Sequence, residues 1–270
     1  MVVQHNLQAA NTNRMLGGNV KAVQKSTEKL SSGYQVNRAA DDAAGLSISE
    51  KMRNQIRGIN QAVKNSEDGV SLIQTAEGNM NEIHSILQRM GELATKAAND
   101  VNASDDRTAI QNEIDQLSEE ITSISKKAAF NGTKLLTGSF TNKYLQVGAV
   151  KGEEMKISIS SMSATSLKVN SLKVSSHKVA GSAMTAITDA IKTVSAARSK
   201  LGAIQNRLNY TINNLENYSE NLTAAESQIR DTDMATEMTN YTKNNILQQA
   251  AQSMLAQANQ STQGVLSLLQ

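Results

Sequence analysis

Residues 181–230 read GSAMTAITDAIKTVSAARSKLGAIQNRLNYTINNLENYSENLTAAESQIR, and this stretch decides the fold. Apolar side chains recur at every seventh position without interruption: Ile187, Val194, Leu201, Leu208, Leu215, Leu222 and Ile229. Mostly small or apolar residues stand three positions further along in each repeat: Ala190, Ala197, Ile204, Thr211, Tyr218 and Ala225. A seven-residue repeat sustained over this length is typical of a long helix that packs in a bundle or a coiled coil.

Two stretches nearer the start of the chain carry the same kind of periodicity. In the first, apolar residues follow one another at steps of three, four or seven: Ile56, Ile59, Val63, Val70, Ile73, Met80, Ile83, Leu87, Met90 and Ala94. We expect this helix to be capped by Asp41 or Asp42 and to end near Asn99. The second covers residues 107 to about 129 and is capped by residues 104–106. The sequence therefore predicts long helices that pack side by side.

The middle of the chain, residues 134–178, lacks this periodicity. The preceding residues 130–133, FNGT, are typical of a tight turn. Apolar and polar residues then alternate around Leu145 and Ile157, which predicts short strands. Residues 158–176 are rich in Ser and Thr, and we expect them to form an exposed tip.

Both ends of the chain carry weaker amphipathic patterns. In residues 245–270, one apolar stripe runs from Ile246 to Met254, and Gln248 lies away from its centre. Residues 3–31 show a similar pattern, which two adjacent glycines weaken. Burying these few side chains releases less free energy than ordering the backbone costs. We therefore expect each end to fold only on a partner, which is either another part of the chain or another copy of it.

The composition excludes several classes of protein. The 270 residues include no Cys, Pro or Trp and only 3% aromatic residues, which excludes disulfides and does not suit a compact enzyme core. The net charge of +2 comes from interleaved acids and bases, so we predict no nucleic-acid surface. The first residues do not resemble a cleavable signal peptide, and no apolar run is long enough to predict a membrane span.

The sequence offers no motif for catalysis or metal binding. The 3 histidines are scattered singly, and there is no HExxH, no phosphate-binding glycine loop and no Cys/His set. Asp41 and Asp42 could form a paired-carboxylate site, but a turn with a helix cap is the better interpretation. We therefore expect no enzyme activity and no cofactor.

The predicted fold class is mainly α: a long coiled-coil-like helical bundle rod with a small β-hairpin region, its termini paired as an inner helical core. The changes of pattern divide the chain into consecutive segments. These are an N-terminal inner-core helix and connector (1–43), the N-terminal part of the rod (44–139), a short β or variable tip (140–180), the C-terminal rod helix (181–230) and the C-terminal inner-core helix (231–270).

Several separate motifs resemble bacterial flagellin. Near the start these are TEKLSSGYQVNRAADDAAGLSISEKMRNQIRG (27–58), SEDGVSLIQTAEGNMNEIHSILQRMGELATKAAN (66–99) and AAFNGTKLL (128–136). Near the end they are AESQIRDTDMATEMTNYTKNNILQQAAQSMLAQANQ (225–260) and VLSLLQ (265–270). The sequence departs from the family pattern in two places. Residues 261–263 stand where flagellins commonly carry Pro, and residues 140–180 take the place of large outer domains.

The resemblance implies a structural subunit that is exported unfolded, without a cleavable signal peptide, and polymerises into the extracellular flagellar filament used for swimming. The implied partners are further copies of the chain, a flagellar export chaperone, the filament cap and the hook–filament junction protein. Polymerisation would depend on the paired terminal helices, through Leu7, Leu16, Val20, Val23, Leu30, Ile246, Leu247, Met254, Leu255, Leu266 and Leu269.

A second implied site is a receptor surface on the helical rod. The residues that fall on the segment recognised by the host flagellin-sensing Toll-like receptor are Gln88, Arg89, Glu92, Leu93 and, on the next helix, Glu113. Arg and Leu beside an acid make a compact hot spot. The alternative is that these residues only make contacts between neighbouring subunits.

The rival interpretations differ in class. The hook–filament junction protein shares flagellin-like ends, but the motifs AAFNG, ILQQA and LAQANQ favour flagellin. A secreted coiled-coil effector or adhesin would not need both chain ends to match one family, and an enzyme would need catalytic residues. By the same resemblance, residues 158–176 are either a plain polar loop or a site of O-linked glycans.

Overall fold

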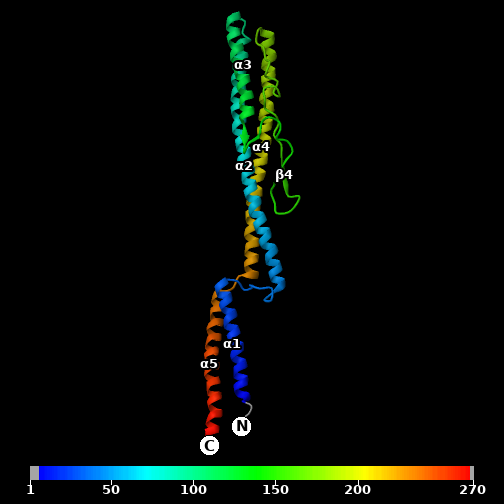
Figure 1. Ribbon diagram of the computed structural model, residues 1–270. Helices are drawn as coiled ribbons and strands as arrows, with labels where there is room; N and C mark the ends of the chain where they lie inside the picture. Colours follow the sequence, from blue (N-terminus) through cyan, green and yellow to red (C-terminus); the bar gives the residue numbers. More distant parts are fainter. Residues whose placement is uncertain (1–5, 268–270) are drawn as a thin grey trace. The chain divides into compact units, whose positions relative to one another are not determined.

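The computed structural model describes residues 6–267, with side chains described as far as Ser261 (Figure 1). The helices are α1 (Leu7–Ser32), α2 (Ala43–Ala97), α3 (Ser104–Lys127), α4 (His177–Arg230) and α5 (Met234–Ser267), and the strands are β1 (Ala129–Phe130), β2 (Thr133–Lys134), β3 (Lys143–Gln146) and β4 (Glu154–Ile157). The mainly α class predicted from the sequence is confirmed. Within the described residues, no helix is long and apolar enough to cross a membrane.

The chain forms two compact units. Unit 1 combines Met1–Asn54 with Asn221–Gln270, and unit 2 is Gln55–Glu220. Helices α2 and α4 run through both units, so each contributes one end to unit 1 and the rest to unit 2. Unit 2 is therefore one continuous piece of chain, whereas unit 1 joins the two ends of the chain.

Unit 2 is a bundle of antiparallel helices around one apolar core (Figure 1). After a short loop, α3 runs back along α2, and Nδ1 of His177 at the start of α4 lies 2.6 Å from the carbonyl oxygen of Ala98. Helix α4 thus begins where α2 ends and runs in the opposite direction. Its buried large apolar residues in this unit are those that the seven-residue repeat predicts: Ile187, Val194, Leu201, Leu208 and Leu215.

The buried face of α2 differs from the predicted one in its first half. Within unit 2, most of its buried positions recur at steps of three and four: Ile59, Ala62, Ser66, Gly69, Ile73, Ala76, Met80, Ile83, Leu87, Met90, Ala94 and Ala97. Leu93, beside Ala94, is also buried. The predicted seam residues Ile56, Val63 and Val70 are only half-buried. Between Ile59 and Ile73, the seam of α2 consists of small residues. A search for regularly spaced large apolar residues does not detect them.

Two short antiparallel hairpins follow α3. Strands β1 and β2 pair Phe130 with Thr133. The turn between them has positive φ at both Asn131 (46°) and Gly132 (75°), as a tight primed turn requires. The predicted FNGT turn is therefore confirmed. Strands β3 and β4 form the second hairpin with 4 residues each, which confirms the predicted short strands.

The β3–β4 hairpin packs on the first half of α2. Helix α3 has 24 residues and α2 has 55, so with the same rise per residue α3 leaves the first part of α2 uncovered. A Cβ built on Gly69 would lie 2.5 Å from the Leu145 side chain. A Cβ built on Gly58 would lie 2.9 Å from that of Ala149. Glycine at these two positions therefore lets the hairpin rest directly on the α2 backbone.

Residues 158–176, named the strap below, do not form the expected exposed tip. Most apolar residues of the strap are buried in unit 2, namely Ile159, Met162, Ala164, Leu167, Val169 and Val174, and Leu172 is half-buried. The side chain of Gln111 on α3 donates to the Leu172 carbonyl at 2.8 Å and accepts from the Val174 N–H at 2.9 Å. The Ser and Thr residues that suggested a free loop are the exposed or half-buried edge of a packed segment.

In unit 1, α1 and α5 form an antiparallel pair (Figure 1). The side-chain amide of Asn6 donates to the Ala258 carbonyl at 3.0 Å, and the Lys29 ammonium lies 3.9 Å from the Glu237 carboxylate. The less exposed positions of α1 include Ala9, Thr12, Leu16, Asn19, Val23, Ser26 and Leu30. Those of α5 include Glu237, Tyr241, Asn244, Gln248, Ala251, Leu255 and Ala258. The predicted pairing of the two ends is confirmed, and the seam between them is rich in polar side chains.

The segment after α1 and the segment before α5 pair with each other in unit 1. The Thr232 N–H donates to the Gly33 carbonyl at 2.9 Å, and the Gln35 N–H donates to the Arg230 carbonyl at 2.7 Å. The Arg230 guanidinium lies 4.6 Å from the centroid of the Tyr34 ring, which is a cation–π contact. Gly33 ends α1 with a φ of 76°, a conformation that favours glycine.

Asp41 and Asp42 form the turn and the helix cap that the sequence favours. The Asp42 carboxylate accepts from two N–H groups in the first turn of α2, at 3.0 and 2.9 Å. The Asp41 carboxylate lies 2.9 Å from Nζ of Lys25 on α1. The hydrogen bond from Lys25, followed by one from the Arg38 N–H, lowers the pKa of Asp41 below its ordinary value. Both carboxylates therefore hold the connector between α1 and α2 in place.

Candidate functional site

Unit 1 exposes a set of large apolar side chains: Leu7, Met15, Ile48, Met234, Met238, Ile246, Leu247 and Met254. Among its described side chains, the buried apolar ones are Val36 and Ala258. A soluble monomer seldom leaves so much of its apolar surface in water, and such surfaces usually mark contacts with other proteins. The exposed apolar surface of unit 1 is therefore the first candidate site.

Helix α5 presents an apolar stripe away from α1. Ile246 is 60% exposed, Leu247 42% and Met254 57%, and Ala250 between them is also exposed. We name Ile246, Leu247, Ala250 and Met254 the outer stripe. Gln248, by contrast, is among the less exposed positions of the pair. Gln248 thus lies off the apolar stripe, as the sequence pattern predicts, and on the side of α5 that α1 covers.

The other residues predicted for polymerisation also lie on α1 and α5. Those that are half-buried on the pair are Leu16, Val20, Val23, Leu30 and Leu255. Leu7, in the first turn of α1, is 77% exposed. Leu269 lies outside the described residues, as does the side chain of Leu266. The predicted residues with described side chains are thus divided between the seam of one helix pair and its outer surface.

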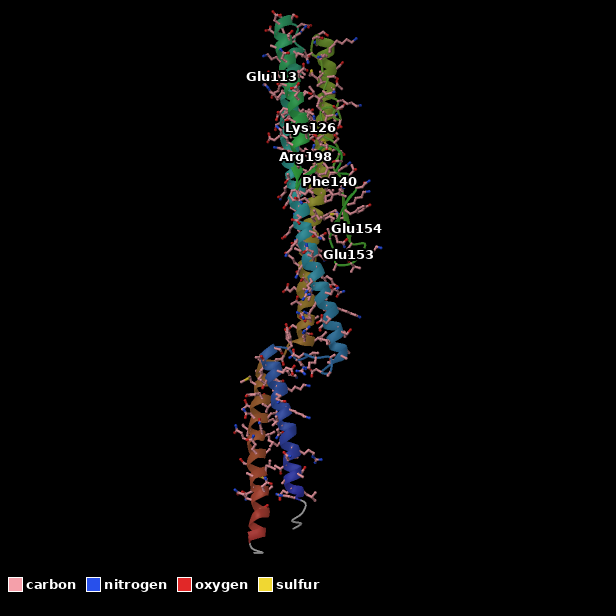
Figure 2. The ribbon with its side chains drawn as sticks, viewed as in Figure 1. Glu113, Lys126, Phe140, Glu153, Glu154 and Arg198 are labelled. Carbon is pink, nitrogen blue, oxygen red and sulfur yellow. The ribbon has the colours of Figure 1, made fainter. Side chains whose placement is uncertain are left out.

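On unit 2, Arg89 of α2 and Glu113 of α3 form an exposed ion pair. Nη2 and Nε of Arg89 donate to one Glu113 oxygen at 2.9 and 3.1 Å, and its Nη1 donates to Glu92 at 3.2 Å. The hydrogen bond to Glu113, followed by that to Glu92, raises the pKa of Arg89 above its ordinary value. Gln88 is exposed beside Arg89, and Figure 2 labels Glu113 on α3. The structure therefore brings Arg89, Glu92 and Glu113 together, whereas Gln88 is placed near them only by its position next to Arg89 in the sequence.

Leu93 differs from the expectation for this cluster. Its side chain is only 4% exposed because it packs in the apolar core of unit 2. It lines a surface depression together with Glu113, Lys96 and Asp106. The sequence reasoning did not include Lys96 and Asp106, although Lys96 follows Glu92 by one helical turn, a spacing that places both on one face. The accessible part of this site is therefore charged rather than apolar.

Neither candidate surface has the features of a catalytic centre. Among the residues that the structure describes, no group of three or more His, Cys, Asp or Glu side chains could hold a metal ion. Met15 belongs to the apolar stripe of the N-terminal helix, whereas the exposed Met234 and Met238 precede the C-terminal stripe and were not predicted. Both surfaces are suited to contact with other proteins.

Both halves of the chain match a known protein family. Residues 3–141 match the N-terminal helical region of bacterial flagellin, and residues 184–269 match its C-terminal helical region. The chain belongs to the bacterial flagellin family. Flagellins are structural subunits of the bacterial flagellar filament, so this flagellin is a structural protein and not an enzyme.

Full-length relatives agree with this assignment. A flagellin of Halalkalibacterium halodurans is 53% identical over 271 residues, with 100% of both chains covered. The flagellar filament 33 kDa core protein of Treponema phagedenis is 44% identical over 285 residues, again with 100% of both covered. The crystal structure of Bacillus cereus flagellin matches with a TM-score of 0.51 and 29% identity, over 56% of this flagellin and 88% of that chain.

Proposed function

We propose that this flagellin polymerises through unit 1, where the α1–α5 pair of each subunit packs against the pairs of its neighbours. The observation that carries this proposal is the outer stripe, which faces away from α1 and leaves Ile246 and Met254 more than half exposed. No described segment of unit 1 covers these side chains. A second copy of the chain supplies an apolar surface of the same kind.

The energetics favour assembly over an isolated pair. Burying the exposed parts of Ile246, Leu247 and Met254 between subunits contributes about 1 kcal/mol for each side chain. The seam of the pair contributes less, because polar residues such as Asn19, Asn244 and Gln248 occupy many of its positions. The pair therefore gains most of its order when neighbouring subunits cover it, which couples the ordering of α1 and α5 to polymerisation.

The arrangement of surfaces favours an open polymer. On α5, the outer stripe lies opposite the side that packs on α1, so it is free to contact a neighbouring subunit. If the outer stripe of one subunit packs on a different surface of the next, the contact is heterologous. Heterologous contacts that do not close a ring extend into a helical filament. The same exposed surface offers a binding site for an export chaperone, and the filament cap and the hook–filament junction protein are the further partners that we propose.

Removing part of α5 tests the polymerisation surface. Deletion of residues 245–270 is expected to leave unit 2 folded and to abolish filaments, as seen by circular dichroism and by electron microscopy after seeding. A double substitution, Ile246→Glu with Met254→Glu, is expected to lower the polymer yield at least about tenfold, because it buries charge in the contact. Gln252→Glu adds charge at an exposed polar position of the same helix and serves as the control. Long filaments from the deletion variant would refute the proposal.

The Arg89 cluster supports a second function, recognition of the monomer by the host flagellin-sensing Toll-like receptor. Arg89 is held between Glu113 and Glu92, so its guanidinium is presented in a defined position without a large entropic cost on binding. The alternative is a contact between neighbouring subunits. Both are compatible, because a surface covered in the filament is open on the monomer.

A paired substitution separates receptor binding from general effects of charge. Arg89→Ala with Glu113→Ala is expected to weaken binding to the receptor ectodomain about tenfold or more, measured by surface plasmon resonance. Asp189→Ala with Lys192→Ala removes another exposed ion pair of unit 2, with an N–O distance of 3.3 Å, and is the matched control. Equal affinities of both variants and the native chain would refute the receptor assignment.

A further inference from the structure

The methionines of the described chain differ between the two units. In unit 2, the buried ones are Met80, Met90, Met155 and Met162. In unit 1, the exposed ones are Met15, Met234, Met238 and Met254, with exposed fractions of 62, 48, 49 and 57%. Met52 of unit 1 and Met184 of unit 2 are half-buried. The thioethers that are open to solvent are thus concentrated in the unit that we assign to polymerisation.

These thioethers are the groups of this chain most open to mild two-electron oxidation. The sequence contains no Cys and no Trp, so no thiol or indole competes for an oxidant. Oxidation of methionine to its sulfoxide converts a flexible apolar side chain into a polar one and is reversible by sulfoxide reductases. Susceptibility follows exposure, so solvent reaches the unit 1 thioethers before those in the core of unit 2.

We propose that Met15, Met234, Met238 and Met254 are a peroxide-sensitive modification site whose oxidation blocks polymerisation and leaves unit 2 folded. The inference rests on the proposed function of unit 1. The sulfur lone pair attacks one oxygen of a peroxide, the S–O bond forms as the O–O bond breaks, and the proton of the transferred hydroxyl leaves with the other oxygen as water. The sulfur is oxidised and the peroxide is reduced.

The positions of these residues explain why oxidation acts on assembly. Met254 belongs to the outer stripe itself. Met15 of α1 lies level with the middle of that stripe, because the antiparallel register places Asn6 beside Ala258 and Lys29 beside Glu237. A sulfoxide at either position has to lose its water when a neighbouring subunit covers it, and nothing in the outer stripe offers it a hydrogen-bond donor.

Assembly in turn protects the methionines of unit 1 from oxidation. Once neighbouring subunits cover unit 1, peroxide no longer reaches Met15 and Met254, whereas the buried methionines of unit 2 are protected in both states. Unassembled subunits are therefore sensitive to peroxide and assembled ones are resistant. The four sites are expected to oxidise at least about tenfold more slowly in filaments than in monomers, because burial excludes the oxidant.

Peroxide treatment of monomers and preformed filaments, followed by peptide mapping and polymerisation assays, tests the proposal. Oxidised native monomers are expected to lose at least about tenfold in polymer yield while the circular dichroism of unit 2 is unchanged. A variant with Met15, Met234, Met238 and Met254 each replaced by Leu keeps the apolar volume, and it is expected to polymerise equally well before and after peroxide. Met52→Leu with Met184→Leu is the matched control and is expected to remain sensitive.

Two results would overturn the inference. One is oxidised native protein, with sulfoxide at all four sites, that polymerises as well as untreated protein. The other is a four-Leu variant that loses polymerisation on peroxide treatment as fully as the native chain. Either result leaves the proposed function standing as long as deletion of residues 245–270 abolishes filaments, so the two failures are distinguishable. Sulfoxide reductase treatment is expected to restore polymerisation of the oxidised native protein.

Discussion

Unit 2 and unit 1 are built from helices with the same three-and-four spacing of buried positions, but only unit 2 has a continuous apolar core. In unit 2 the seam of α2 from Ile73 onward is apolar and fully buried. In unit 1 the seam between α1 and α5 contains Asn19, Asn244 and Gln248 at equivalent spacings. The spacing of the buried positions determines that a segment forms a packed helix. Whether the helix is stable without a neighbouring subunit depends on how apolar the residues of its seam are.

The largest expected effect on stability comes from truncating a buried side chain in the core of unit 2. Leu87 is 0% exposed, so Leu87→Ala is expected to lower the free energy of unfolding of this unit by about 3 kcal/mol, through lost burial and the cavity it leaves. Chemical denaturation followed by circular dichroism measures the change. Ile246→Ala in unit 1 is the matched control, and its expected effect on the monomer is within about 0.5 kcal/mol. Equal losses from both substitutions would contradict the contrast between the units.

A smaller effect is expected where the β3–β4 hairpin touches α2. Gly69→Ala places a Cβ 2.5 Å from a terminal methyl group of Leu145 and 3.3 Å from Leu208, and it is expected to destabilise unit 2 by about 1 kcal/mol, because these side chains have to repack. Gly78→Ala, in the same helix but with nothing within 4 Å of the new Cβ, is expected to stabilise it by about 0.5–1 kcal/mol. The difference between the two variants in thermal unfolding measures the close approach. A Gly69→Ala variant as stable as Gly78→Ala would contradict a close contact between the Leu145 side chain and α2.

The smallest effect is expected from acid, and it concerns unit 1. Hydrogen bonds lower the pKa of Asp233, chiefly from the Thr236 hydroxyl, and that of Asp41, chiefly from Lys25. A lowered folded-state pKa gives stability that is present above the ordinary value of 3.8 and is lost as the pH falls through the folded value. We therefore expect the protection factors of amides in α1 and α5, which compare exchange with the intrinsic rate at the same pH, to fall over this range.

The substitution Asp233→Asn provides the control for the acid effect. Asp233→Asn keeps a side-chain oxygen that can cap α5 but removes the titrating group, so the acid-dependent loss of protection in α5 is expected to diminish. Hydrogen exchange read out by mass spectrometry follows α1 and α5 separately. An identical pH dependence in the native chain and in Asp233→Asn would exclude this cap as the cause.

Large, regularly spaced side chains made most of the helical architecture predictable. The repeat from Ile187 to Leu215 identifies the buried face of α4 because each member is large and apolar. The same reasoning misplaced part of the α2 face, since Ala62, Ser66 and Gly69 are buried for their small size. It also misjudged the strap, where scattered residues such as Met162 are buried although Ser and Thr dominate the composition.

The candidate sites were predictable to different degrees. The Arg89–Glu113 pair was found because family resemblance aligned two helices that periodicity alone does not connect. Burial of Leu93 was not foreseen, because the predicted seam runs through Met90 and Ala94, and only the packed bundle reveals which side Leu93 faces. The outer stripe was recognised as apolar, but its direction was not, since a sequence pattern does not state whether α1 or another subunit covers it.

Helices α2 and α4 run for 55 and 54 residues without a break, and the chain contains no proline. Prolyl isomerisation takes about 10–100 s near room temperature and is a common slow step in refolding. Because this chain has no proline, its folding does not include that slow step.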